Sequence, residues 1–173
     1  KSVKISDIDP ENHLFSHMNR RRLDFEAMRD SIVFVAGQMD ARIGGRSTDL
    51  EKKPYTGRRA VYGQTVRQNI PALFRAFDVA NPSIHTPSRP QTTVPQQALF
   101  AMNSDFVQEK SRQLSLGLKE QETKARVREL YRRVLSRQPT ANELTMAKQY
   151  LVQATFEQLA QVLLMSNEFL FVE

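Results

Sequence analysis

Apolar residues recur at helical spacing through most of the C-terminal half of the chain, and this spacing predicts five helices. The first ends at about residue 102, the second near Gly117, the third spans 122–137, and two more follow Thr140 and Thr155. The residues expected to face inward are Phe106, Val107 and Leu114 in the second helix, Val127, Leu130, Tyr131, Val134 and Leu135 in the third, and Phe156, Leu159, Val162, Leu163 and Phe169 in the last part. Short connections favour antiparallel neighbours, so this half is predicted to be a small bundle.

Capping patterns mark several of these helix starts. Thr140 with Glu143, and Thr155 with Gln158, have the threonine-to-acid or threonine-to-amide spacing of a capping box. Asn103 or Ser104 is expected to cap the second helix.

The stretch 89–103 is expected to join the two halves of the chain as a structural hinge. Thr93 with Gln96 predicts a further capping box, and Pro95 suits the first helical turn. An apolar stripe of Ala98, Leu99 and Met102 is then expected to pack inward. Arg89 is expected to reach a carboxylate or loop carbonyls, because a guanidinium offers five donors.

The N-terminal half shows one long helical pattern and much loop. Asn19 is expected to cap a helix over about 20–39, with Arg22 and Glu26 paired at four-residue spacing. The run Ile32–Ala36 is apolar on every side, which predicts deep burial and leaves a strand as the alternative. A polar loop over 40–60, a short strand over 60–66, a helical turn opened by Pro71 and a proline-rich segment over 81–95 follow.

These patterns predict a mainly α fold, with a helical bundle in the C-terminal half, a loop-rich N-terminal half and at most a minor β element. We expect a single domain over 1–173, comprising an N-terminal arm at 1–18, a long helix and loops at 19–80, and the bundle at 81–173. At 173 residues the chain is long enough to bury a stable core without disulfides or a structural metal. It begins with Lys1, and we expect it to be a piece of something longer.

The composition narrows the chemistry. With no cysteine, the chain has no disulfide, thiolate metal site, cysteine nucleophile or covalent haem attachment of its own. His13 and His17 have a four-residue spacing, but Leu14 stands where the zinc-protease pattern needs glutamate. The third histidine, His85, lies in a proline-rich loop. We therefore predict no metal and no cofactor, with surface histidines as the simpler reading.

The net charge of +6 is spread along the whole chain. The triplet Arg20–Arg22 and five arginines between 126 and 137 are the densest basic clusters. Arginines around one helix extend past the core into solvent, and the aromatic residues fall mostly on apolar stripes. Nucleic-acid binding is therefore the weaker alternative.

No glycine-rich phosphate loop, nucleophile elbow or characteristic carboxylate pair occurs. The densest polar set comprises Arg58, Arg59, Tyr62, Arg67, Asp78, Arg89, Thr92, Thr93, Gln96 and Asn103. These residues could form a binding site, although a network that satisfies buried backbone groups of two long loops is favoured.

Five co-linear segments carry a resemblance to a known family. They are residues 19–31, Arg58–Tyr62, Thr92–Ser104, Leu130–Thr140 and Leu163–Val172. Together they resemble a domain of unknown function that is abundant in planctomycetes. This domain forms the C-terminal part of large secreted proteins, many with a cytochrome-c-type domain near the N-terminus. Arg46 and Asp105 depart from the pattern at local turns, where a small residue or proline and a proline are expected.

The resemblance implies an extracytoplasmic (periplasmic or secreted) setting and supplies no catalytic residues. We expect a non-catalytic helical interaction or structural module whose partner is another domain of its parent chain or an extracellular protein. The main alternative is a catalytic or glycan-binding domain in a secreted polysaccharide-processing system, which requires a pocket where the 40–60 and 78–95 loops meet.

Overall fold

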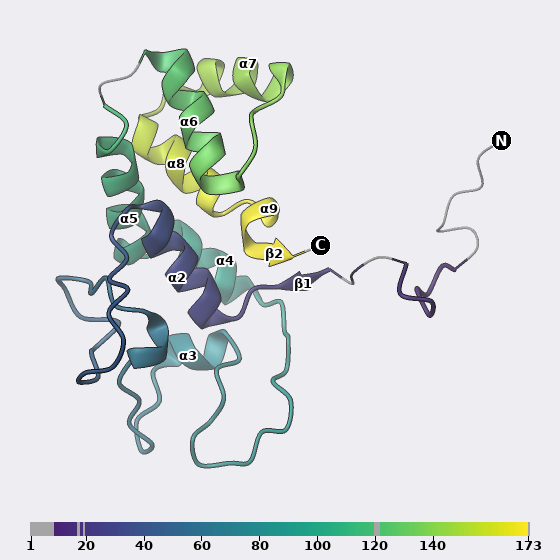
Figure 1. Ribbon diagram of the computed structural model, residues 1–173, viewed down its shortest axis with the longest axis vertical. Coiled ribbons are helices and arrows are strands. Elements are labelled where there is room, and N and C mark those ends of the chain that lie inside the picture. The colour runs from purple at the N-terminus through teal and green to yellow at the C-terminus, as the bar shows by residue number, and fades with distance from the viewer. Residues whose placement is uncertain (1–8, 17, 19, 120–121, 173) are drawn as a thin grey trace.

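The computed structural model describes residues 9–16, 18, 20–119 and 122–172, and in this part the fold is mainly helical, as predicted. The elements in chain order are β1 (Arg21–Arg22), α2 (Phe25–Val35), the 3-10 turn η1 (Ala60–Tyr62), α3 (Ala72–Ala76), α4 (Pro95–Asn103), α5 (Asp105–Leu116), α6 (Thr123–Leu135), α7 (Ala141–Tyr150), α8 (Phe156–Leu164), α9 (Asn167–Leu170) and β2 (Phe171–Val172). Figure 1 shows α5, α6, α7 and α8 in the upper part of the molecule, with α3 and long loops below α2.

Helices α5 and α8 form the centre of the core, and their contact is the most extensive between any two elements. From α5, Val107 and Leu114 are buried, and from α8 Ala160 and Leu164 are buried. Helix α6 adds a face on which Val127 and Leu130 are completely enclosed. Each such side chain contributes about 1.5–3 kcal/mol on burial, so this face holds the bundle together.

Three predicted caps are confirmed. Ser104 accepts a hydrogen bond from the Phe106 N–H at 3.2 Å and so caps α5. Reciprocal capping boxes open α7 and α8: the Thr140 hydroxyl accepts from Glu143 N–H, and the Thr155 hydroxyl accepts from Gln158 N–H. Because these caps need neighbours only two or three residues apart, the sequence suffices to place them.

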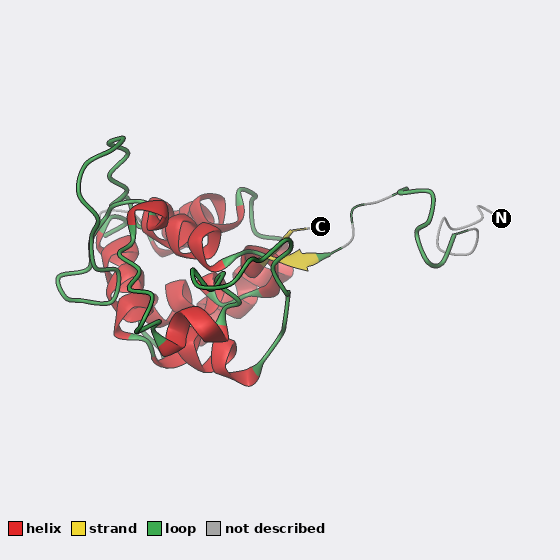
Figure 2. Cartoon of the chain, turned by 90° about the horizontal axis from the view of Figure 1, so that it is seen from below, coloured by secondary structure: helices red, strands yellow, loops and turns green. Residues whose placement is uncertain are grey.

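The two ends of the described fold lie side by side. Arg21 pairs with Val172, and Arg22 with Phe171, in a two-stranded antiparallel sheet. Before β1, residues 9–16 extend away from the helices, as Figures 1 and 2 show. The minor β element therefore pairs the segment just before α2 with the C-terminal end of the described chain, and it is not a hairpin.

The N-terminal helix is shorter than predicted. It begins at Phe25, with Asp24 as cap residue, and ends at Val35, where Gly37 adopts a φ of +71°. Residues 21–22 belong to β1 instead, because their backbone pairs with β2. The predicted Arg22–Glu26 pair is consequently wrong, and the predicted cap Asn19 lies outside the described residues. The strand alternative for 32–36 is also wrong.

The strand predicted over 60–66 is wrong. Residues Ala60–Tyr62 form a 3-10 turn in which Gly63 N–H donates to the Ala60 carbonyl at 2.8 Å. The Ala60 N–H donates to Asp30 Oδ1 of α2 at 2.7 Å. This tertiary hydrogen bond replaces the strand ladder that a weak alternation of apolar residues suggested.

Helix α4 differs most from prediction. It begins at Pro95 with Val94 as cap residue, and neither Thr93 nor Gln96 forms a capping box. Leu99 and Met102 are 54% and 53% exposed rather than inward. Gln97 and Ala101 occupy the inner face instead; the Gln97 amide donates to the Ala76 and Thr92 carbonyls at 2.8 and 3.0 Å. In the same way, Val162 of α8 is 49% exposed, because Ala160 and Leu164 face the core.

Candidate functional site

The ten residues of the predicted polar set fall into two networks and four exposed positions. Around α2, the Arg58 guanidinium lies 4.2 Å from the centre of the Tyr62 ring and donates to the Gly44 carbonyl. The Tyr62 hydroxyl accepts from the Gly44 N–H at 2.9 Å. Arg59 lies 3.6 Å from Asp30. This first network holds the 40–60 loop to α2.

The second network joins the 78–95 segment to the N-terminal elements. Asp78 accepts from Arg22 Nη2 at 3.1 Å and from the N–H and hydroxyl of Thr92 at 2.9 Å each. Arg89 makes a bidentate pair with Glu26, at 2.8 and 3.0 Å. The predicted contact of Arg89 with a carboxylate is confirmed, and both interactions serve to anchor a long loop.

The remaining four residues stay apart from these networks. Arg67, Thr93, Gln96 and Asn103 are exposed, and no interaction described within residues 9–172 joins them to either network. The ten residues therefore do not form one site in the described part of the chain. Five well-formed clefts in that part of the chain are each lined by at most one of the 40–60 and 78–95 loops.

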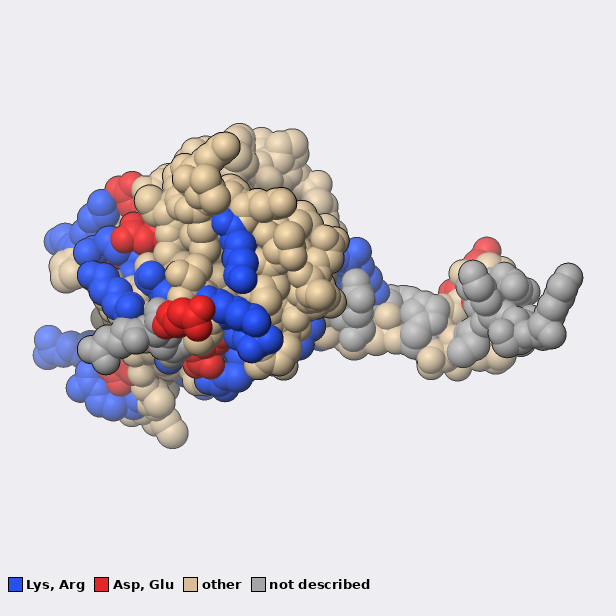
Figure 3. Space-filling view, turned by 90° about the horizontal axis from the view of Figure 1, so that it is seen from above, with Lys and Arg blue, Asp and Glu red and all other residues tan. Residues whose placement is uncertain are grey.

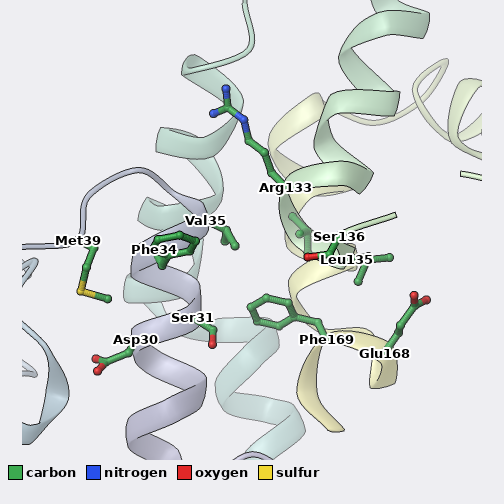
Figure 4. A pocket seen from close by; sticks show the side chains of 11 residues that line it. Asp30, Ser31, Phe34, Val35, Met39, Arg133, Leu135, Ser136, Glu168 and Phe169 are labelled. Carbon is green, nitrogen blue, oxygen red and sulfur yellow. The ribbon is translucent and has the colours of Figure 1, made fainter. Parts of the chain in front are cut away.

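A cleft that the polar set does not include lies between α2, the end of α6 and α9. Its volume is about 510 Å³, and both apolar and polar side chains line it. Figure 4 shows Phe34 and Val35 on α2 and, across the space, Phe169 extending toward α2 from the C-terminal segment. We call this the α2–α9 cleft; it is lined by Asp30, Ser31, Phe34, Val35, Met39, Arg133, Val134, Leu135, Ser136, Glu168 and Phe169.

Phe34 is the most unusual residue of the α2–α9 cleft. It is 70% exposed, while its neighbours Ile32 and Val33 are 2% and 0% exposed. The apolar run Ile32–Ala36 has more apolar residues than one helix face can bury, so one large ring remains in solvent. The predicted deep burial of this run is therefore wrong for Phe34, and the surplus of apolar residues in the run is the sequence feature that indicates an exposed ring.

The opposite wall depends on the turn that follows α6. Ser136 adopts a left-handed φ of +57°, which ends the helix. The next residue, Arg137, then contacts two carboxylates from different helices: Glu143 at 2.6 Å and Glu168 at 2.6 Å. This arginine fixes α7 and α9 against the end of α6 and so sets the position of Phe169.

Each charged side chain at the rim of the α2–α9 cleft has an intramolecular partner. Asp30 holds the Ala60 N–H and lies 3.6 Å from two guanidiniums, those of Arg29 and Arg59. Hydrogen bonds from Arg137 lower the pKa of Glu168. Arg133 donates to Glu129 at 2.9 Å. The carboxylates at this rim are thus already engaged by arginines or by a backbone N–H.

Charged residues are unevenly distributed elsewhere on the surface. From Gln138 to Asn167 the charged residues are Glu143, Lys148 and Glu157. Figure 3 looks onto the α7 end of the molecule and shows a broad area with few charges, beside Lys, Arg, Asp and Glu side chains gathered along one side. Met146 and Val152 are 58% and 81% exposed in this segment.

The described residues also bear on whether the chain could hold a metal or cross a membrane. Within the described residues, no three histidine, aspartate or glutamate side chains are grouped as a metal would require, and His17 lies outside those residues. None of the helices in that part of the chain combines the length and hydrophobicity that a bilayer crossing needs.

Over residues 1–151 the chain matches the family described as PSD1, protein of unknown function (DUF1553). The match covers most of the chain and confirms the resemblance to a domain family of unknown function. No curated protein and no solved structure gives a significant match.

Proposed function

This chain belongs to the PSD1 family, for which no function is described, and we propose that it is a non-catalytic helical interaction module. In this proposal the module forms the C-terminal part of a larger extracytoplasmic protein. Its α2–α9 cleft receives an apolar side chain from another domain of the parent chain or from an extracellular protein.

The exposure of Phe34 carries the proposal. A phenylalanine that is 70% exposed beside a partly apolar cleft leaves a large ring in water, and covering it would release that ring's hydration. Interfaces are centred on such aromatic residues, with a polar rim around them. Val35, Leu135 and Phe169 supply the apolar wall around the ring, and Asp30 and Glu168 supply the rim.

The pairing of the rim charges favours docking over catalysis. A general base or nucleophile needs a free or pKa-shifted group aimed into its cavity. Here Asp30 and Glu168 are held by arginines and by a backbone N–H. Because the rim carboxylates are already paired with arginines, they need no new partner when a docking protein displaces water from the cleft. This arrangement suits a protein interface.

The test is to place a photoreactive p-benzoylphenylalanine at position 34 of the full-length parent protein in its native cells. The expected result is a covalent crosslink to a protein segment outside residues 9–172, identified by peptide mass spectrometry. The same residue at position 43 is the matched control, because Ile43 is 94% exposed but lies in the 40–60 loop away from the cleft. Equal crosslinking from both positions, or none from position 34, would contradict the proposal.

A second measurement separates protein docking from the glycan alternative. Phe34→Ser should reduce the identified protein contact about tenfold or more, as expected for an aromatic hot spot, with Ile43→Ser unchanged. Binding of sulfated glycans that survives in Phe34→Ser, without any protein crosslink in the wild type, would support the alternative. Fractionation of the same cells tests the extracytoplasmic setting, and recovery with the cytoplasm would contradict it.

A further inference from the structure

The loop that follows α2 carries an exposed apex, residues 41–47. Every residue of this apex is exposed, and Ile43, at 94%, is the most exposed large apolar side chain in the described part of the chain. Arg42 precedes Ile43 directly and Arg46 follows it by three residues, and both are exposed. In Figure 1 the blue loops after α2 lie on the side of the molecule away from α9. The apex thus offers solvent an aliphatic side chain flanked by two arginines.

The apex is held in place by its own backbone groups. The Gly44 N–H donates to the Tyr62 hydroxyl at 2.9 Å, and the Gly44 carbonyl accepts from the Arg58 guanidinium. Gly44 and Gly45 adopt φ angles of +75° and +94°, which residues with a side chain rarely adopt. Ile43 is therefore carried by a structured turn, and less conformational entropy is lost when it contacts a partner.

Most of the net charge of the chain is concentrated around this loop. Although basic residues occur along the whole chain, residues 40–67 carry seven Lys and Arg against three Asp and Glu, which is +4 of the net charge of +6. Two of these cations pair with carboxylates outside the segment: Lys53 with Asp105 at 2.6 Å, and Arg59 with Asp30 at 3.6 Å. An excess of two positive charges remains once these pairs are counted.

Part of this excess lies at the apex itself. Arg46 makes no ion pair within the described residues, whereas Arg42 is paired with Asp40 at 2.7 Å. The other two anions of the segment, Asp49 and Glu51, line a cleft beside α3 to which no residue of the apex contributes. The unpaired guanidinium of Arg46 is therefore in the same exposed turn as the isoleucine.

We propose that the apex 41–47 binds the surface of an anionic phospholipid bilayer. Ile43 enters the boundary between headgroups and acyl chains, and Arg46 contacts lipid phosphates. Reversible attachment to a bilayer combines burial of apolar side chains with attraction of basic residues to anionic lipids, and this loop supplies both. A sulfated polysaccharide would also attract the arginines, but it offers an isoleucine no apolar surroundings. The exposure of Ile43 therefore favours the bilayer.

The inference is independent of the docking proposal, because no residue of the apex lines the α2–α9 cleft. A photoreactive residue at position 43 is expected to crosslink to phospholipid rather than to protein, so position 43 still serves as the control for protein crosslinking. Failure of either binding test leaves the other unaffected.

The test is co-sedimentation of the full chain with vesicles of phosphatidylcholine, alone or in an equal mixture with phosphatidylglycerol. We expect saturable binding to the mixed vesicles, at least about tenfold tighter than to phosphatidylcholine alone, and weaker binding as salt is raised. Ile43→Ser should weaken this binding about tenfold, and Arg46→Gln about fivefold.

Two matched control variants should bind the mixed vesicles as the wild type does. Ile84 is a loop isoleucine that is 67% exposed and has no Lys or Arg within four residues, so Ile84→Ser removes a similar side chain without a basic flank. Arg128 is an exposed arginine of α6, so Arg128→Gln removes the same charge as Arg46→Gln at a position outside the loop.

Insertion of the apex can be measured directly, because the chain has no tryptophan. In Ile43→Trp, binding to the mixed vesicles should shift the emission to shorter wavelength, and brominated lipid should quench it, whereas Ile84→Trp should show neither change. Equal quenching at both positions, vesicle binding that Ile43→Ser leaves unchanged, or no binding to the mixed vesicles would overturn the proposal. Tighter binding to dextran sulfate than to vesicles, weakened by Arg46→Gln but not by Ile43→Ser, would identify a polysaccharide surface instead.

Discussion

Gln97 shows how one buried polar side chain decides which face of a helix turns inward. Its amide donates to the carbonyls of Ala76 and Thr92, two groups from separate loop segments. With Gln97 and Ala101 inside, Leu99 is left exposed at 54%. The hydrophobic stripe predicted for this helix therefore faces solvent.

On α4, replacing the polar residue Gln97 should lower the free energy of unfolding more than replacing the apolar residue Leu99. This order is the reverse of the one that hydrophobicity suggests. Gln97→Ala leaves two carbonyls without their donor and should lower the free energy of unfolding by about 1–3 kcal/mol. Leu99→Ala should change it by no more than about 0.5 kcal/mol, because the side chain is mostly in solvent. Urea denaturation measures both. A larger loss from Leu99→Ala than from Gln97→Ala would contradict this orientation of α4.

The threonine caps provide a second comparison at the residue scale. Thr155→Ala removes a hydroxyl that accepts from the Gln158 N–H and should cost about 0.5–2 kcal/mol. Thr93→Ala should be nearly neutral, because Val94 is the cap residue of α4 and no side chain caps it. Thermal denaturation of the two variants beside the wild type tests this. Equal losses would indicate that Thr93 does cap α4.

At the scale of elements, Arg137 joins three helices. It follows α6 and donates to Glu143 in the first turn of α7 and to Glu168 in α9. Its hydrogen bonds lower the pKa of Glu143 to about 2, from an ordinary value of 4.5. A carboxyl group whose pKa is lowered by folding stabilises the fold above its unfolded pKa, and this contribution is lost as the pH falls.

Arg137→Met should therefore destabilise the protein by about 0.5–1 kcal/mol at neutral pH, since the network is partly exposed. The difference from wild type should disappear as the pH falls from about 4.5 through about 2, where Glu143 takes up its proton. Denaturation with urea at a series of pH values measures this. Arg112→Met, at an exposed position of α5, is the control and should show no such convergence. A difference that is undiminished below pH 2 would mean that packing, rather than charge, explains the effect of Arg137.

Across the whole molecule, Asp78 connects segments from both ends of the fold. Its carboxylate accepts from Arg22 of β1 and from Thr92 just before α4, and its side chain is 11% exposed. Through β1, the same arginine lies beside the C-terminal strand β2. Asp78 thus holds the proline-rich loop against the small sheet.

Asp78→Ala should cost about 3–5 kcal/mol, because it leaves the charge of Arg22 buried without its partner. Hydrogen exchange should then increase in residues 79–94 more than in α5 and α8. Asp78→Asn should cost less, because the amide keeps one acceptor and asparagine tolerates the positive φ of 58° at this position. Uniform exchange throughout the molecule in Asp78→Ala would contradict a local role in holding the loop.

The sequence alone determined the elements whose signals are local. The helices α5 to α8 and their caps follow from residues three or four positions apart, as do Ser104, Thr140 and Thr155 as cap residues. Helical periodicity and capping act within one turn, so a single sequence contains the information. The contact of Arg89 with a carboxylate was also foreseeable, although its partner Glu26, 63 residues away, was not.

Only the tertiary structure decided which groups meet across long sequence separations. The polar set was divided between two networks because Asp30 binds Arg59 and the Ala60 N–H, whereas Asp78 binds Arg22 of β1 and the Thr92 N–H. The ring of Phe34 was left in solvent because α2 has more apolar residues than its inner face can take. These outcomes depend on which carbonyls and N–H groups lack partners once the loops are closed, and no local pattern along the chain encodes that.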